Sequence, residues 1–332
     1  MKPRIALVTG GYSGEAEVSY GSANTIQKNI DRNKFDLYRI DITRDGWYYT
    51  NTEGVKSTVN KNDFSIHIGS QKILFDGVLI AIHGTPGEDG KLQGYFDMLE
   101  IPYTTCDAGV SSITFNKRYT VAVASFSGIT VSRSVLLFKE DSTKFEFLAE
   151  AKKLKFPVFV KPNNGGSSIG TTKVDKKESL DNAVARALKE DSQVLVEEFI
   201  PGREFTIGVY KTKGNIVPLP VTEIISKKEF FDFEAKYHGA SNEVTPAEID
   251  NALKNLIQTQ AVKIYKIFNC SGVVRIDFIY NSADRKLYML EINTVPGQTD
   301  ASLVPQQILS TGGNLKDFYS AQIEECLRKK EK

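Results

Sequence analysis

The sequence predicts an α/β fold whose N-terminal part contains a parallel sheet. Short strand-like runs alternate with helical segments through the first hundred residues, which is typical of parallel strands joined by crossover helices. The 332 residues are enough for two or three domains. Hydrophobic residues make up 41% of the chain and charged residues 25%, the usual balance of a globular protein that can bury a substantial core.

The N-terminal unit follows from this alternation. Buried strands are expected at residues 5–8, 35–42 and 78–82, with a helix at 18–30 and a small hairpin at 47–50. Residues 101–103 close the unit. Asp107 then has the residue type and position of a helix N-cap.

The rest of the chain mixes helices and strands less regularly. Helices are expected at 108–115, 119–126 and 145–154, and strands at 131–138, 158–160, 194–197, 204–210 and 217–225. The polar residues 226–244 predict a long loop, and long loops in compact domains are usually functional. A helix is then expected from Thr245 as N-cap, through Pro246 at the first helical position, to about Phe268.

The charge balance and the cysteines exclude several classes of protein. Lys and Arg number 42 against 41 Asp and Glu, and the formal net charge of +1 offers no basic face for nucleic acid. No run approaches the roughly 18 apolar residues of a membrane helix, and the N-terminal apolar segment is too short for a signal peptide. Cys106, Cys270 and Cys326 are far apart in the sequence, which fits a reducing compartment. We therefore expect a cytoplasmic protein with no nucleic-acid or membrane partner.

The strongest chemical signal is a predicted antiparallel hairpin over residues 273–293. If the numbers of paired residues sum to 568, Asp277 lies opposite Glu291 and Arg275 opposite Asn293. Directly opposed side chains have Cβ atoms about 5 Å apart. The hairpin therefore brings two carboxylates together on one face.

Two carboxylates at that separation repel each other unless a cation compensates. Asp, Glu and Asn offer oxygen ligands, which suit Mg²⁺, and Mg²⁺ commonly completes its shell with water and phosphate. This interpretation implies a nucleotide substrate. The alternative is a solvated edge hairpin in which Arg275 neutralises Asp277.

A second signal is a lysine followed by a glycine- and serine-rich turn. Lys161 ends a strand-like run, and residues 163–170 supply glycines whose backbone N–H groups can approach phosphate oxygens. The order differs from the Walker pattern because the lysine precedes the glycines. The alternative is an ordinary glycine-rich hairpin turn.

Two further segments have the character of ligand sites. The strand-like residues 194–200, with Glu198 at the end and Glu204 just beyond, can present backbone groups to an adenine and a carboxylate to a ribose; the alternative is a solvated Glu198. Residues 10–15 and 82–90 follow predicted parallel strands, where α/β sheets bind ligands. For His83, in the second of these loops, the alternative is a structural histidine.

Together these residues resemble the ATP-grasp superfamily. The resemblance is carried by Lys117, Lys161 and residues 165–170, 197–200, 275–277 and 291–297. Residues 10–19, 83–94 and 234–237 narrow it to the D-alanine–D-alanine ligase family, and the similarity extends from residue 5 to about residue 309. The chain has Ala16 and Ala301 where relatives commonly have Arg and His.

The resemblance implies a three-domain ATP-grasp architecture. Its parts are an N-terminal α/β substrate-binding domain over residues 1–105, a central lid domain over 106–201 and a C-terminal domain over 202–332, with ATP between the last two. The implied reaction is the ATP-dependent ligation of two D-alanines through a D-alanyl phosphate, for peptidoglycan precursor synthesis. The family also implies a homodimer.

Three alternatives to this reaction remain open. The chain could be a D-alanine–D-lactate ligase or another ATP-grasp carboxylate–amine ligase, since either would share the nucleotide-site residues. It could also be an ATP-binding protein without turnover, although the intact Arg275, Asp277, Glu291 and Asn293 argue against this.

The resemblance also implies roles for individual residues. Those expected to contact ATP are Lys117, Lys161, Glu197, the backbone of Glu198, Phe199 and Ile200, Glu204 and Lys236. Those expected to bind two Mg²⁺ ions, or Mn²⁺ in their place, are Asp277, Glu291 and Asn293. Glu15 and His83 are expected at the first D-alanine, and Ser302 and Leu303 at the second. The expected catalytic groups are Arg275 and the Gly297 N–H at the oxyanion, and Tyr237, Ser167 and Glu15 in a contact that closes the loop.

Overall fold

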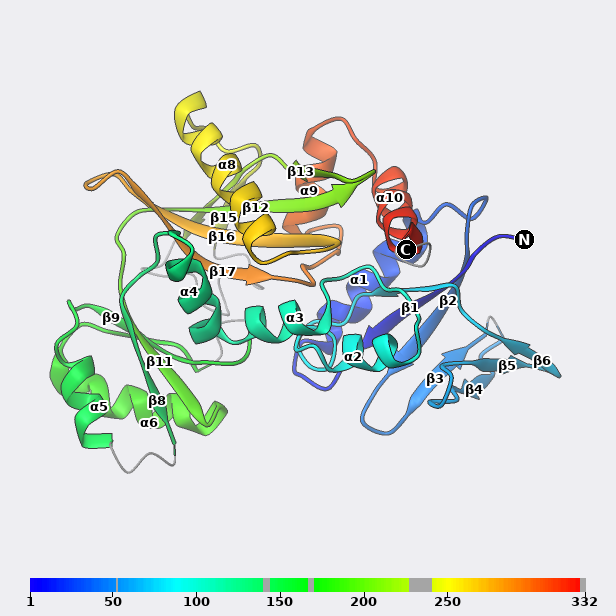
Figure 1. The fold of residues 1–332 in the computed structure, drawn as a ribbon, viewed down its shortest axis with the longest axis horizontal. Helices are drawn as coiled ribbons and strands as arrows, with labels where there is room; N and C mark the ends of the chain where they lie inside the picture. Colours follow the sequence, from blue (N-terminus) through cyan, green and yellow to red (C-terminus); the bar gives the residue numbers. More distant parts are fainter. Residues whose placement is uncertain (52, 140–143, 167–169, 227–240, 329–332) are drawn as a thin grey trace.

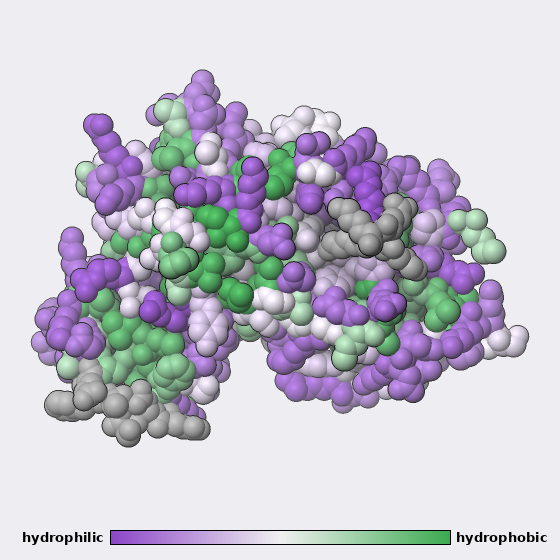
Figure 2. All heavy atoms as spheres, viewed as in Figure 1, coloured by the Kyte–Doolittle hydropathy of each residue, from purple (hydrophilic) through white to green (hydrophobic). Residues whose placement is uncertain are grey.

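The computed structural model describes residues 1–51, 53–139, 144–166, 170–226 and 241–328. They form an α/β molecule with three main sheets, shown in Figure 1. The sheet of residues 134–198 forms a lobe of its own, and in Figure 2 an indentation separates this lobe from the N-terminal one. No helix in the described part of the chain is both long and apolar enough to cross a membrane.

The N-terminal sheet has five strands in the order β4-β3-β2-β1-β7. They are β1 (Arg4–Gly10), β2 (Asp36–Ile42), β3 (Trp47–Thr50), β4 (Lys56–Thr58) and β7 (Gly77–Ile80). β1 pairs in parallel with β2 and β7, while β3 and β4 continue the sheet antiparallel. The predicted parallel strands are confirmed, whereas residues 47–50 form the single strand β3, which pairs with β2 and β4, and not a hairpin of their own. The small hairpin of β5 (Ile66–Ile68) and β6 (Gln71–Ile73) was not predicted.

β1 is buried on both faces, which explains its unbroken apolar sequence. Ile5 and Leu7 pack against α1 (Ala16–Asn29) and against the last two helices, α9 (Leu303–Ser310) and α10 (Leu315–Leu327). Ala6 and Val8 pack on the opposite face, in the cluster that includes α2 (Lys91–Met98). The C-terminal helices therefore complete the N-terminal core and bring the loop before α9 toward the N-terminal loops.

The central sheet is antiparallel, in the order β10-β9-β11-β8. Its elements are β8 (Ser134–Phe138), α5 (Lys144–Ala151), β9 (Val158–Pro162), β10 (Thr172–Val174), α6 (Leu180–Glu190) and β11 (Gln193–Glu198), with a 3₁₀ turn at Lys177–Ser179. Val158 and Val160 pack under α5 and α6. Because side chains alternate along a strand, Phe159 and Lys161 lie on the uncovered face. α6 was not predicted.

The C-terminal sheet has the order β15-β14-β12-β16-β17, with β13 paired to β12. Its strands are β12 (Arg203–Thr212), β13 (Asn215–Pro218), β14 (Thr222–Ser226), β15 (Ser241–Val244), β16 (Val273–Asn281) and β17 (Lys286–Asn293). α8 (Asn251–Ile267) covers one face. The connecting helices α3 (Ala108–Phe115) and α4 (Lys117–Phe126) reach the same core, and Asp107 caps α3 as predicted, accepting from Val110 N at 2.8 Å.

Two predictions about this region are wrong. The expected strand over 217–225 is split between β13 and β14, which both pair with β12, because Pro220 between them has no N–H to continue the ladder. Thr245 is not a helix N-cap: its hydroxyl bonds that of Thr222 at 2.7 Å, at the end of the β14–β15 pair. The helix begins at Asn251 and is capped by Asp250, which accepts from Leu253 N at 2.8 Å.

Candidate active site

A cavity of about 1240 Å³ lies between the central and C-terminal sheets and reaches the N-terminal loops. Its walls include the uncovered face of the central sheet, one face of the C-terminal sheet, the loops after β1 and β7, and the segment that leads into α9. Thirteen of the described residues that line it are acidic and five are basic. A polyphosphate ligand would therefore require added positive charge.

The face of the C-terminal sheet toward the cavity carries polar side chains, and the opposite face carries apolar ones. Ile276 and Phe278 on β16 pack under α8, so the alternate residues Arg275 and Asp277 point into the cavity. The pairing places Asp277 opposite Glu291 and Arg275 opposite Asn293. The predicted register of the hairpin is therefore confirmed at these four residues.

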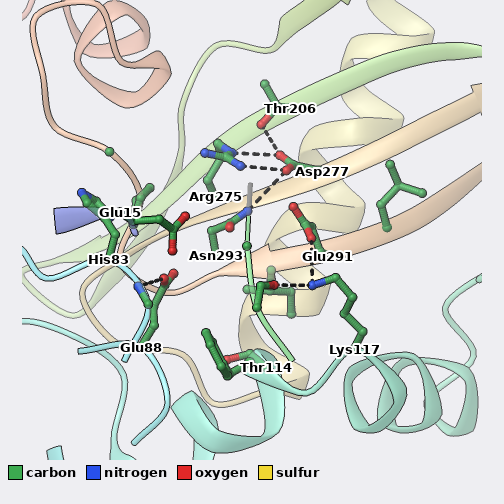
Figure 3. Close-up of a pocket in the computed structure, with 18 of the residues that line it drawn as sticks. Glu15, His83, Glu88, Thr114, Lys117, Thr206, Arg275, Asp277, Glu291 and Asn293 are labelled. Carbon is green, nitrogen blue, oxygen red and sulfur yellow. Dashed lines mark hydrogen bonds and ion pairs between the residues drawn. The ribbon is translucent and has the colours of Figure 1, made fainter. Parts of the chain in front are cut away.

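Asp277 accepts several hydrogen bonds, shown in Figure 3. Its two carboxylate oxygens accept from Arg275 Nε at 3.0 Å and Nη2 at 2.9 Å. The Thr206 hydroxyl donates at 2.5 Å and Asn293 Nδ2 at 3.3 Å. Burial by itself lowers the pKa of Arg275, but Asp277 and Glu291 raise it above its ordinary value. Arg275 therefore neutralises Asp277, as the alternative interpretation of the hairpin predicted.

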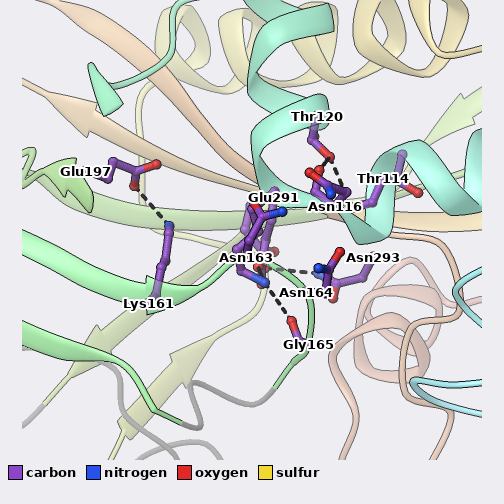
Figure 4. Close-up of polar contacts among 12 residues, drawn as sticks. Thr114, Asn116, Thr120, Lys161, Asn163, Asn164, Gly165, Glu197, Glu291 and Asn293 are labelled. Atoms are coloured by element: carbon purple, nitrogen blue, oxygen red, sulfur yellow. Dashed lines mark hydrogen bonds and ion pairs between the residues drawn. The ribbon is translucent and has the colours of Figure 1, made fainter. Parts of the chain in front are cut away.

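Glu291 faces a second cation. Lys117 Nζ lies 3.9 Å from Glu291 Oε2 and donates to the Gly165 carbonyl at 2.6 Å. Figure 4 shows how Asn163 and Asn164 lie beside the start of α4. Asn163 accepts from the backbone N–H groups of Lys117 and Arg118, at 3.1 and 2.9 Å. Lys117, the first residue of α4, is thus fixed against the glycine-rich turn.

The central-sheet wall of the cavity contains Lys161. Its Nζ donates to Glu197 Oε1 at 3.0 Å, and both side chains are largely buried (Figure 4). The Glu198 carboxylate points elsewhere, since it accepts from Lys155 N at 2.8 Å. The backbone of Glu198 is also bonded, to Ser132 and Arg133.

Phe199 and Ile200 follow as cavity-lining residues. Phe199 N donates to Pro157 O at 3.0 Å. Within the described part of the chain, the groups of this segment that remain available to hydrogen-bond a nucleobase are the Phe199 carbonyl and the Ile200 N–H. Glu204, on β12, lines the cavity just beyond them.

His83 lies at the end of the cavity formed by the N-terminal loops. Its Nδ1 bonds the Val295 carbonyl at 2.7 Å, and its Nε2 bonds Ser22 Oγ at 3.0 Å. Burial lowers its pKa, so the ring is neutral, with the Nδ1 proton donated to the carbonyl. His83 lines the cavity and also connects the N-terminal unit to the segment before α9.

Glu88 lies within the 82–90 loop and was not among the predicted site residues. Its carboxylate accepts from Gly84 N at 2.8 Å and from Val295 N at 3.3 Å. Burial, together with the charge of Glu15, raises the pKa of Glu88 to about 7. The available sequence signal was its place in a polar loop after a buried strand.

Glu15 lies between the N-terminal loops and the glycine-rich turn. A Cβ at Gly84 would come within 2.9 Å of Glu15 Oε2, and one at Gly166 within 2.8 Å of Oε1. The absence of a Cβ at both glycines therefore lets the carboxylate lie this close to the backbone. The structure brings Glu15, His83 and the glycine-rich turn together as predicted.

The segment before α9 supplies the last predicted residues. Gly297, Ser302 and Leu303 all line the cavity, and Ser302 occupies the N-cap position of α9. Ser302 Oγ accepts from Thr299 N at 3.0 Å. Ser167, Lys236 and Tyr237, and with them most of the predicted loop, lie outside the described residues.

The oxygen donors of Asp277, Glu291 and Asn293 fit a Mg²⁺ or Mn²⁺ site. All three line the cavity on adjacent strands, and the donor set contains only oxygens. In the described part of the chain no group of three or more His, Cys, Asp or Glu side chains is placed to hold a metal. A cation here would therefore depend on the amide of Asn293 and on oxygens from a phosphate or water.

Comparisons with known proteins cover nearly the whole chain. The family model described as D-ala D-ala ligase N-terminus matches residues 4–106, and that described as D-ala D-ala ligase C-terminus matches residues 122–324. The D-alanine–D-alanine ligase of Bacteroides fragilis is 42% identical over 98% of this chain and 99% of its own, and that of Azobacteroides pseudotrichonymphae is 45% identical over 96% and 98%.

Solved structures of this kind have the same fold. The VanG D-Ala:D-Ser ligase from Enterococcus faecalis superposes with a TM-score of 0.88 at 33% identity, over 98% of this chain and 99% of that one. The D-alanine–D-alanine ligase from Bacillus anthracis complexed with ATP gives 0.78 at 28% identity, over 99% of each. This chain belongs to the D-alanine–D-alanine ligase family of ATP-grasp enzymes.

Proposed function

We propose that this chain joins two D-alanines into D-alanyl-D-alanine at the expense of ATP, as a step in peptidoglycan precursor synthesis. The observation that carries the proposal is the opposed pair Asp277 and Glu291, with Arg275 between them and the N-terminal loops. This arrangement supports a metal–phosphate site next to a site for a small zwitterion. Full-length similarity to enzymes of this name supports the same reaction.

ATP is proposed to lie between the central and C-terminal sheets. Lys117 and Lys161 are placed to pair with its phosphates, and Lys161 is held for this by buried Glu197. The Phe199 carbonyl and Ile200 N–H would bond the adenine, and Glu204 the ribose. Lys236 is a further proposed phosphate contact.

Two Mg²⁺ ions are proposed at Asp277, Glu291 and Asn293, with Mn²⁺ as a substitute. The acidic excess of the cavity supports this, because a polyphosphate would otherwise meet mostly carboxylates. When bound, the ions would neutralise charge on the transferring phosphoryl group. The chain's own part is to hold the three donors on adjacent strands, with Thr206 and Arg275 fixing Asp277.

The proposed chemistry has two steps. A carboxylate oxygen of the first D-alanine attacks the γ-phosphorus, and the bond to ADP breaks. The amine of the second D-alanine then attacks the acyl carbon, phosphate leaves, and the nitrogen loses a proton. Arg275 and the Gly297 N–H are proposed to stabilise the tetrahedral oxyanion. The bonds from Arg275 to Asp277 use Nε and Nη2, which leaves Nη1 for the substrate.

One amino-acid subsite is proposed at each end of this region of the cavity. Glu15 would pair with the ammonium of the first D-alanine, with His83 beside it. Ser302 and Leu303, at the N-terminus of α9, would meet the carboxylate of the second, where the helix dipole favours an anion. A contact of Tyr237 with Ser167 and Glu15 is proposed to close the site against water, because acyl phosphates hydrolyse.

The domain division is proposed as 1–105, 106–201 and 202–332, supported by one main sheet in each range. We also propose a homodimer and a cytoplasmic location. The three cysteines are free, which supports a reducing compartment. Equilibrium sedimentation of the purified chain tests the dimer.

The decisive experiment is incubation of the full chain with ATP, Mg²⁺ and D-alanine, followed by mass detection of the dipeptide and measurement of phosphate. We expect dipeptide and phosphate in equal amounts, each dependent on both substrates. Phosphate without dipeptide would contradict the function. D-lactate offered with D-alanine separates this enzyme from a ligase that makes the ester.

A further inference from the structure

A carboxylate that the proposed mechanism does not use lines the cavity beside the second amino-acid subsite. We propose that Glu243 binds the ammonium group of the second amino acid and so selects an amino acid over a hydroxy acid at that subsite. This inference rests on the proposed function and deepens it.

The position of Glu243 follows from strand pairing. It pairs with Ile224 on β14, and Ile224 pairs with Glu204 on β12. Directly paired residues share a face of the sheet, so Glu243 is on the same face as Glu204 and Asp277. All of these residues line the cavity.

Glu243 is coupled to the start of α9 through one side chain. Gln306 Nε2 donates to Glu243 Oε2 at 3.2 Å and to the Ala301 carbonyl at 2.7 Å. The backbone N–H of Gln306 bonds the Ser302 carbonyl at 3.1 Å, one helical turn below. Gln306 therefore connects the Glu243 carboxylate to the predicted carboxylate subsite at Ser302 and Leu303.

The chemistry of an α-amino acid matches this spacing. Its carboxylate and its ammonium are attached to the same carbon. A ligand with its carboxylate at the N-terminus of α9 therefore has its nitrogen a few ångströms away. A side chain beside that subsite can reach this nitrogen. Arg275, which would face the acyl carbonyl, lines the same cavity as Glu243, so the nitrogen, Glu243 and the reaction centre would lie in one region.

The other carboxylates near this region have different partners. Asp277 accepts two bonds from Arg275, and Glu88 accepts two from backbone N–H groups. Glu15 lies at the opposite end, between Gly84 and Gly166. Among the described residues, the hydrogen bond that Glu243 accepts from a side chain comes from the neutral amide of Gln306.

Burial raises the pKa of Glu243 above its ordinary value, because its protein neighbours only partly compensate the half-buried negative charge. An incoming ammonium supplies that compensation. D-lactate has a neutral hydroxyl at the same atom and gains no charge pairing. Glu243 therefore favours D-alanine over D-lactate, and it treats D-serine, which has the same ammonium, like D-alanine.

The test compares Glu243→Gln with the wild type in the full chain. The substitution keeps the size of the side chain and an oxygen that can accept from Gln306, but it removes the charge. Because a charge-assisted hydrogen bond contributes more than a neutral one, we expect the apparent KM of the second D-alanine to rise roughly 10- to 100-fold. The KM for ATP and the KM for the first D-alanine should stay within about twofold of wild type, and the melting temperature within a degree or two.

The matched control is Glu248→Gln. Glu248 is in the same segment, is exposed and is not among the cavity-lining residues. The same charge change there should therefore leave the KM values of both D-alanines unchanged. Glu243→Asp keeps the charge on a shorter side chain and should recover part of the loss.

A mixture of ATP, D-alanine and D-lactate gives a second readout. The Glu243→Gln variant should shift its products toward the ester by about tenfold, and with D-serine in place of D-lactate the ratio should not move. An unchanged KM and an unchanged amide-to-ester ratio, in a variant that still makes dipeptide, would overturn the role of Glu243. A wild-type chain that makes no dipeptide would instead overturn the proposed function, and this inference with it.

Discussion

Asp277 lies directly across the β16–β17 pair from Glu291, and the register of the two strands shifts immediately after this pair. Up to Asp277 the paired residue numbers sum to 568, and from Phe278, which pairs with Met289, they sum to 567. Leu290 is the extra residue of this bulge, and it lines the cavity. Bulges near active sites commonly re-aim side chains, and this one ends the regular pairing at the carboxylate pair.

The first prediction concerns the metal-binding carboxylates. Glu291→Gln should lower Mg²⁺-dependent turnover by at least 100-fold while changing the melting temperature little, because its ion pair with Lys117 is long, at 3.9 Å. Asp277→Asn should also cost stability, on the order of 3 kcal/mol, because it leaves the buried guanidinium of Arg275 without its anion. Turnover during a Mg²⁺ titration, measured beside thermal melting, separates the two effects. Wild-type activity in the Glu291 variant would contradict the metal assignment.

The second prediction concerns the phosphate lysine. Lys161→Ala should raise the KM for ATP and lower kcat, because the ammonium would serve both the ground state and the transition state. Lys161→Arg should recover only part of this, since a planar guanidinium does not replace a compact ammonium beside Glu197. Steady-state kinetics with varied ATP measures both constants. Lys153→Ala, an exposed change on the far side of the central sheet, is the control and should have no effect.

The third prediction is a pH dependence of stability that arises from Glu88. Its pKa is about 7 in the folded protein and about 4.5 ordinarily, so between these values the folded protein keeps a proton that the unfolded chain has lost. Stability should therefore fall as the pH rises through this window and level off above 7. Glu88→Gln should remove a decrease on the order of 2–3 kcal/mol. Thermal melts of the ligand-free protein from pH 4.5 to 8 provide the test, and parallel curves for the two proteins would refute it.

The fourth prediction concerns Gln307, which is fully buried at the point where β12 changes partners. Its amide accepts from Gly208 N at 2.9 Å and donates to the Thr206 carbonyl at 3.2 Å and to Thr222 Oγ1 at 3.0 Å. Gln307→Leu would leave these groups buried without partners, at a cost of about 3 kcal/mol. Urea denaturation measures the loss. Gln71→Leu, at an exposed position of β6, should change stability by less than about 0.5 kcal/mol.

Several features followed from the sequence because they depend on neighbours along the chain. The alternation of strand and helix predicted the parallel pairing of β1 with β2 and β7. The pattern of the 273–293 hairpin predicted Asp277 opposite Glu291, since a two-residue period and a short turn leave few registers. Asp107 capped the predicted helix for the same local reason.

The tertiary structure decided what depends on contacts between distant segments. Thr245 and Pro246 have the composition of a helix start, but pairing of β15 with β14 extends the strand to that point, and the helix begins at Asn251. Glu198 looked like a ligand carboxylate, yet its side chain bonds Lys155 N, a partner 43 residues away. Burial of Glu88 beside Glu15, and of Glu243 beside Gln306, joins loops and strands that no local pattern connects. Local preferences for backbone conformation depend on short stretches of sequence, whereas the charge environment of a side chain depends on which remote segments fold around it.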